Sequence, residues 1–181
     1  MSYHQVMTGF LDFISVFGTS NETGESRELR FSGFREQTTL SKPARGPAVH
    51  ELGRTGRQFQ LCYNLKGVAC ISPPTQSMKQ KVWSIRQAAF HHQFDAETGT
   101  AFWIIAKGDL ELKDRIQNMT GKDGRPEDKA FGTPEECFRS TLAVHLLQCH
   151  WSTEEWRWYI QWLEDVTEVE VSHHNRSGYA M

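Results

Sequence analysis

The chain has 181 residues, a net charge of -2 and 38% hydrophobic residues, enough apolar material for one domain with a packed core. This charge balance argues against nucleic acid as a partner, and the longest strictly apolar run, Ala101 to Ala106, is far shorter than the roughly 20 residues of a membrane-spanning helix. The start of the chain lacks the pattern of a secretory signal and no C-x-x-C pair occurs, so a cytoplasmic location with reduced thiols is expected.

The N-terminal part, residues 1–40, is predicted to contain a short helix followed by an extended segment. One helical face carries Phe10, Phe13, Ile14 and Phe17, and Gly18 follows as a stop signal. Residues 28–40 are expected to be extended. Residues 41–57 are rich in Gly, Pro and Arg, which indicates a mobile loop.

The middle of the chain is predicted to form antiparallel strands. From residue 58 to 65, apolar and polar side chains alternate as in a half-buried strand, and residues 67–72 either continue that strand or turn back beside it. Residues 82–94 and 100–106 then fit a hairpin closed by the turn at 95–99. His91 and His92 are neighbours on a strand and must point to opposite faces, which argues against a metal site formed by this pair. A core or edge histidine beside an exposed one is expected instead.

The second half is predicted to be helical. A first helix carries Leu112, Ile116 and Met119 on one side and stops at Gly121. Capping boxes at 133–136 and at 152–155 are expected to start two more helices. The stripe expected to pack from the second helix consists of Phe138, Leu142, His145, Leu146 and Cys149.

The last helix has apolar side chains on two sides. Trp156, Tyr159, Ile160 and Leu163 form one predicted stripe, while Trp158 and Trp162 lie about 200–240° around the helix. Either another layer of the same protein or a partner must cover these two tryptophans, which makes them the predicted interaction residues. Acidic residues follow from position 164 and oppose the dipole of a helix that ends there.

Three carboxylates at the start of the 109–121 helix are the candidate metal ligands: Asp109, Glu111 and Asp114. Hard oxygen ligands of this kind suit Mg²⁺, usually through water. Dipole complementation at a helix start and solvation of a loop explain the same residues. No cofactor other than Mg²⁺ at this cluster is indicated.

Other chemistry has weaker support. His145 and Cys149 have a spacing that can hold zinc, but no second ligand pair accompanies them and packing explains both. The motifs of serine hydrolases, zinc proteases, phosphate-binding loops and dinucleotide-binding folds are absent. The sequence therefore favours a protein that is not an enzyme; an enzyme would need a deep pocket with a convergent His–Cys or His–Asp pair.

Four segments resemble the N-terminal region of fungal CorA-like proteins: "CYNLKGV", "WSIRQAAFHHQFD", "GTAFWIIAKGDLELKDRI" and "GTPEECFRSTLAVHLLQCHWSTEEWRWYIQWLED". The resemblance runs from about Phe10 to Asp165 and implies a cytosolic α/β domain that leads into a long stalk helix and two membrane helices. The chain departs from a transporter because it has neither membrane helices nor a Gly-Met-Asn pore signature, so transport by this chain alone is not expected.

The sequence thus predicts an α/β (α+β) fold, a mostly antiparallel sheet flanked by helices with a helical C-terminal half. Residues 1–40 and 58–166 are expected to form one domain, with 167–181 as an atypical tail. The expected function is a soluble domain, shortened or evolved free of its pore, in which Mg²⁺ neutralises Asp109, Glu111 and Asp114 and favours one state of a homo-oligomer or partner complex. Two alternatives stay open: a metal-independent interaction module that uses Trp158 and Trp162, and an accessory enzyme of a fungal pathway.

Overall fold

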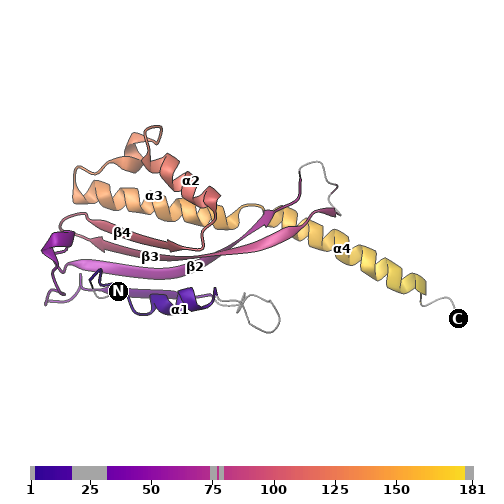
Figure 1. Cartoon of the computed structure of the whole chain (residues 1–181), viewed down its shortest axis with the longest axis horizontal. Coiled ribbons are helices and arrows are strands. Elements are labelled where there is room, and N and C mark those ends of the chain that lie inside the picture. The colour runs from indigo at the N-terminus through magenta and orange to yellow at the C-terminus, as the bar shows by residue number, and fades with distance from the viewer. Residues whose placement is uncertain (1–2, 18–31, 74–76, 78–79, 178–181) are drawn as a thin grey trace. The chain divides into compact units, whose positions relative to one another are not determined.

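The computed structural model describes residues 3–17, 32–73, 77 and 80–177, which form an α+β fold (Figure 1). Its centre is a four-stranded antiparallel sheet in the order β1-β2-β3-β4, so each strand pairs with its neighbour in sequence. The strands are β1 (Phe34–Thr38), β2 (Gln58–Cys70), β3 (Trp83–Asp95) and β4 (Ala101–Ala106). The predicted fold class and the predicted hairpin are confirmed.

Helices cover both faces of this sheet. The short α1 (Phe10–Ser15) lies on one side, and α2 (Leu110–Thr120) and α3 (Pro134–Thr153) lie on the other (Figure 1). A fourth helix, α4, spans Trp156–Ser177. Gly18 and residues 28–31, on which parts of the N-terminal prediction rest, lie outside the described residues.

The chain divides into two compact units, described separately here. The first comprises residues 1–65 and 87–149, and the second comprises residues 66–86 and 150–181. β2 and β3 are each 13 residues long, and each continues from the first unit into the second. β2 thus continues through Cys70 and does not turn back after residue 65.

The polar side of β2 is buried, whereas the apolar side is the buried one in an ordinary half-buried strand. Gln58 and Gln60 are buried, and they face β3: Gln58 contacts Gln93 at 2.6 Å and Gln60 contacts His91 at 3.1 Å. Residues of the N-terminal segment form a second layer over this face, with Phe10 fully buried in its core. The Gln58 amide therefore pairs with the Gln93 amide and the Gln60 amide with the His91 ring, as is usual for buried polar groups.

The starts of α2 and α3 match the predicted signals. Asp109 caps α2, and Gly121 follows its last residue. At the start of α3, the backbone N–H of Glu136 donates to the Thr133 hydroxyl at 3.2 Å, and the Thr133 N–H donates to the Glu136 carboxylate at 3.0 Å. This reciprocal pair is the predicted capping box.

The predicted packing side of α3 is wrong for three of its five residues, while Phe138 contacts the rings of Phe59 and Phe94 and His145 contacts Tyr63 and His92. Leu142 is 49% exposed, Leu146 is 60% exposed, and Cys149 is also exposed. The helix instead buries its other side, which carries Ser140, Thr141, Val144 and Gln148. Apolar side chains surround most of α3, so their spacing could not indicate which side packs.

The prediction for α4 also differs from the structure. Ser152 lies in the last turn of α3, and α4 begins at Trp156 after Glu155, whose φ is 66°. The helix then continues to Ser177, so the acidic residues from position 164 lie inside it and do not form its C-terminal end. The unfavourable helix ending that the sequence suggested at these residues is therefore absent.

Candidate functional site

The carboxylates predicted to bind Mg²⁺ lie at the start of α2, where two of them have structural contacts. Asp109 accepts a hydrogen bond from the backbone N–H of Leu112 at 2.7 Å. Glu111 forms an ion pair with Arg115 at 2.5 Å, and Asp114 is exposed. Among the described residues, no three His, Cys, Asp or Glu side chains are grouped so that they could hold a metal ion. A site with several direct protein ligands does not fit here, and water-mediated cation binding stays a prediction.

The two tryptophans predicted to contact a partner differ in exposure. Trp158 is 50% exposed, and the guanidinium carbon of Arg157 lies 5.6 Å from its ring centroid. Trp162 is partly covered and stacks on Tyr159, with 5.8 Å between the ring centroids. Tyr159 in turn contacts Trp83 of β3 edge-on at 5.7 Å. Trp158 therefore offers the larger accessible aromatic surface in the second unit.

Four polar side chains from β2, β3 and α3 form a group in the first unit that we call the histidine network; His92 and Gln148 are fully buried, and Tyr63 and His145 are partly buried. Tyr63 donates its hydroxyl proton to the side-chain oxygen of Gln148, and the same hydroxyl lies 2.6 Å from Nδ1 of His145. Nε2 of His145 lies 3.0 Å from Nδ1 of His92. The structure thus joins His92 and His145, of which the sequence placed only His145 on a packing side. The expectation that one of the adjacent histidines is exposed is wrong, because His91 and His92 are both fully buried.

His91 lies on the opposite face of the sheet, as strand geometry predicts. Its ring contacts Phe10 of α1 at 5.4 Å, and its Nε2 accepts a hydrogen bond from the backbone N–H of Met7 at 3.3 Å. His92 instead stacks on Trp103, with ring centroids 4.0 Å apart. The expectation that the adjacent histidines cannot chelate one metal ion therefore agrees with their positions.

Every hydrogen bond of the histidine network can form with neutral imidazoles. Because the single hydroxyl proton of Tyr63 goes to Gln148, Nδ1 of His145 must donate to the tyrosine oxygen. Nε2 of His145 then accepts a hydrogen bond from Nδ1 of His92. The buried Nε2 of His92 keeps a lone pair and has no hydrogen-bond partner among the described residues. A proton added at this atom would be enclosed and unpaired.

Burial explains why these histidines resist protonation. Desolvation by burial, and then the positive forms of His145 and His91, lower the pKa of His92 to about 3. Desolvation lowers the pKa of His145 to about 4. For His91, burial and then the charge of Arg54 lower the pKa to about 4. Burial also raises the pKa of the Tyr63 hydroxyl, so the whole network is uncharged near neutral pH.

A pocket of about 340 Å³ lies on the same side of the sheet as the histidine network. We call it the α2–α3 pocket, and its walls include Trp103, Ile105, Ile116, Asp128, Phe131 and Val144. Trp103 belongs to both features, since the indole that lines the pocket stacks on His92. A mainly apolar pocket with few polar groups is the usual form of a small-molecule site.

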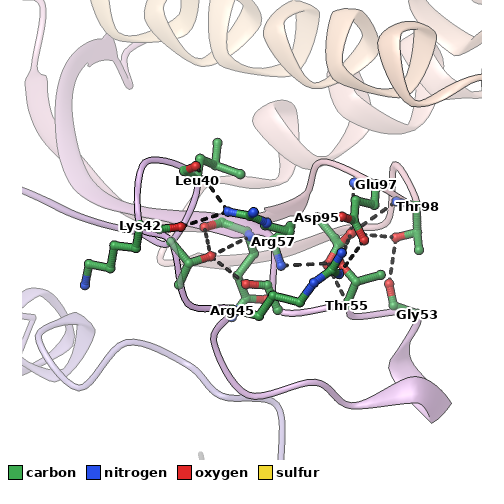
Figure 2. A network of polar contacts seen from close by, with 12 residues as sticks. Leu40, Lys42, Arg45, Gly53, Thr55, Arg57, Asp95, Glu97 and Thr98 are labelled. Atoms are coloured by element: carbon green, nitrogen blue, oxygen red, sulfur yellow. Dashed lines mark hydrogen bonds and ion pairs between the residues drawn. The ribbon is translucent and has the colours of Figure 1, made fainter.

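A second polar cluster holds the turn between β3 and β4 against the 41–57 segment (Figure 2). The buried carboxylate of Asp95 accepts hydrogen bonds from the backbone N–H of Thr55 at 2.7 Å and from the N–H groups of Glu97 and Thr98 at 3.1 Å each. Arg45 pairs with Glu97 at 2.7 Å. The segment predicted to be a mobile loop therefore has specific contacts with the hairpin turn.

Sequence reasoning did not identify the histidine network or the α2–α3 pocket. Tyr63 and His145 are 82 positions apart, and His92 and His145 are 53 apart, so no local spacing relates them. The one available signal was that His145 lies on the side of its helix expected to pack, and that His92 shares a strand face with Phe90 and Phe94. Buried histidines on facing elements are candidates for mutual hydrogen bonds.

None of the helices in the described ranges is sufficiently long and apolar to cross a bilayer. A family model described as CorA-like transporters matches residues 1–175. No curated protein and no solved structure matches the chain.

Proposed function

The chain belongs to the CorA-like transporter family, and from that membership we propose that it acts as a non-catalytic regulatory domain that associates through its helices. In this proposal, a second copy of the domain is the partner, and divalent cations favour the assembled state. The exposed apolar flanks of α4 carry the proposal.

Apolar side chains of α4 extend on both sides of the stripe that the second unit covers. At about 100° per residue, Trp156, Tyr159 and Trp162 form the covered stripe. Trp158 and Ile160, each 50% exposed, lie on opposite flanks of that stripe. A helix with two exposed apolar flanks suits a bundle in which a neighbour packs on each side.

The two flanks differ in composition, which favours identical copies in a ring. If the Trp158 flank of one copy packs against the Ile160 flank of the next, the contact joins two different surfaces. Such heterologous contacts close into rings when the rotation between copies permits it. A single isologous dimer would leave one flank of each helix exposed.

The apolar outer side of α3 supports association independently. Phe138, Leu142 and Leu146 recur every four residues and are exposed, while Ser140 and Gln148 are buried. A contiguous apolar stripe on the surface is typical of an interaction site. We propose that it is covered in the assembled state.

Acidic side chains support the cation component of the proposal. Glu164, Asp165 and Glu168 lie on the side of α4 away from the covered stripe, between the two flanks. When helices assemble, such carboxylates approach one another and repel, and divalent cations reduce this repulsion. Glu111 and Asp114, one turn apart on α2, are the sites proposed for Mg²⁺ in the first unit.

Sedimentation velocity of the complete chain over a concentration series tests the association. We expect the wild type to self-associate and the W158S and I160S variants to raise the dissociation constant at least roughly tenfold, as loss of central apolar contacts does. The matched control is Gln161→Ala, because Gln161 is exposed on the same helix and is polar. Circular dichroism should show unchanged helix content in all variants. A wild type that remains monomeric, or a W158S/I160S variant that assembles like it, would contradict the proposal.

A further inference from the structure

Asp128 places a carboxylate in the wall of the α2–α3 pocket. It belongs to a short 3-10 helix, Pro126–Lys129, and is partly buried. Within the described residues, no hydrogen bond or ion pair holds its carboxylate. The adjacent cation does not pair with it, because Nζ of Lys129 donates to the backbone oxygens of Gly121 and Lys122 at 2.8 Å each.

The hydroxyl groups that line the pocket already have partners. The hydroxyl of Ser140 donates to the backbone oxygen of Ala130 at 3.0 Å, and that of Thr141 donates to the oxygen of Phe138 at 2.7 Å. Thr120 likewise donates to its own helix. Their donor protons are therefore engaged, and Asp128 is the charged residue among those that line the pocket.

We propose that the α2–α3 pocket binds a small amphipathic organic cation, with its ammonium group at Asp128 and its apolar body against Trp103, Ile116 and Val144. An ammonium would supply the charge partner that the partly desolvated carboxylate lacks. The aromatic rings of Trp103 and Phe131 also favour a cation over an anion. The volume of about 340 Å³ lies at the small end of ligand pockets, so the body is a ring with a short chain.

Other ligand classes fit the pocket less well. A neutral apolar molecule would leave Asp128 unpaired beside it, at a desolvation cost. An anion would be repelled. A hard metal ion needs six or more oxygen ligands, whereas this pocket offers one carboxylate among apolar walls.

The test compares three probes with similar bodies: 4-phenylbutylamine, 4-phenylbutanol and 4-phenylbutyrate. Each is titrated into the complete ¹⁵N-labelled chain and followed by ¹H–¹⁵N NMR. We expect the amine to bind most tightly, with shifts concentrated at the residues that line the pocket, and the D128N variant to weaken it roughly tenfold, to the level of the alcohol. The matched control is Asp123→Asn, since Asp123 is exposed in the same loop and does not line the pocket.

A second variant tests the location. V144F fills the pocket without changing its charge, and it should abolish binding of all three probes. The melting temperature of each variant shows whether it is folded. The proposal would be overturned if the wild type did not bind the amine or bound the amine and the alcohol equally. It would also be overturned if amine binding survived D128N, or survived V144F in a folded protein.

Discussion

At the scale of single residues, the unusual feature is three neutral histidines in one small domain, of which two are fully buried and one is partly buried. His91 and His92 are both fully inaccessible to solvent, and His145 faces His92. A charged imidazole would be expensive at each place, because burial removes its hydration and Arg54, near His91, is already positive. These residues therefore couple folding to pH.

We predict that acid destabilises the first unit in a defined pH range. The folded pKa values, about 3 to 4, lie below the ordinary value of 6.5. The unfolded chain then binds more protons between these values, so stability is retained above about pH 6.5 and falls as the pH is lowered towards 4. The slope is about 1.4 kcal/mol per group for each pH unit. Urea unfolding from pH 8 to pH 4.5 measures it.

Two variants test whether the buried histidines cause this dependence of stability on pH. Replacement of His92 by Gln removes one buried titrating group and should flatten the dependence of the unfolding free energy on pH, even if the variant is less stable overall. Replacement of the exposed His150 by Gln should leave the slope unchanged. A free energy of unfolding that is constant from pH 7 to pH 4.5 would show that the histidines are not buried and neutral.

At the scale of elements, the β3–β4 turn depends on one carboxylate. Asp95 ends β3, and its oxygens accept hydrogen bonds from backbone groups of the turn and from Thr55 in the preceding segment (Figure 2). Thr55 and Asp95, which this hydrogen bond brings together, are 40 positions apart in the sequence. A further close contact lies in the same segment, between Gly56 and the backbone of Gly46. Gly56 has a φ of 84°, and a side chain at this position would clash with that backbone.

We predict that D95A lowers the free energy of unfolding by about 3 kcal/mol, because several donors around this buried carboxylate lose their acceptor at once. D95N keeps one carbonyl oxygen and should cost less. The E97Q variant is the control: Glu97 and Arg45 are exposed, so loss of that ion pair should change stability little. Urea unfolding of the three variants gives the comparison. Equal effects of D95A and E97Q would contradict the role assigned to Asp95.

For the helices and strands, the sequence predicts the features that depend on local signals. The starts of α2 and α3 and the β3–β4 hairpin depend on local signals: the cap at Asp109, the box at Thr133, and alternation around a turn. Which side of α3 or α4 packs is not local. Leu142 and Ile160 fit an apolar stripe as well as Val144 and Trp162 do, and only the tertiary arrangement distinguishes them. The burial of Gln60 likewise depends on the layer that residues 3–17 add.

At the scale of the whole molecule, the proposed cation response links the acidic side chains of α2 to the state of assembly. We predict that Mg²⁺ increases the weight-average mass of the wild type and that an E111Q/D114N double variant responds less. Asp109 is left intact because it caps α2. A ligand at 100 times its dissociation constant adds about 2.7 kcal/mol to the state that it favours. Sedimentation in Mg²⁺, in Ca²⁺ and in EDTA measures the response.

The control for this experiment is Glu135→Gln, an exposed carboxylate in the first turn of α3. It removes a charge at a comparable position and should leave the Mg²⁺ response intact. If the wild type assembles equally in Mg²⁺ and in EDTA, or if the double variant responds like the wild type, the cation component fails and association independent of metal remains.

The two long strands also limit where the chain can change length. β2 and β3 run without a break from one unit into the other, and side chains alternate between the faces along each of them. One residue inserted near Leu65 would reverse the facing of every side chain on one side of the insertion. Either Tyr63 would leave the histidine network or the strand end in the second unit would be inverted. Insertions and deletions among homologues should therefore concentrate between β2 and β3, at residues 71–82, and spare both strands.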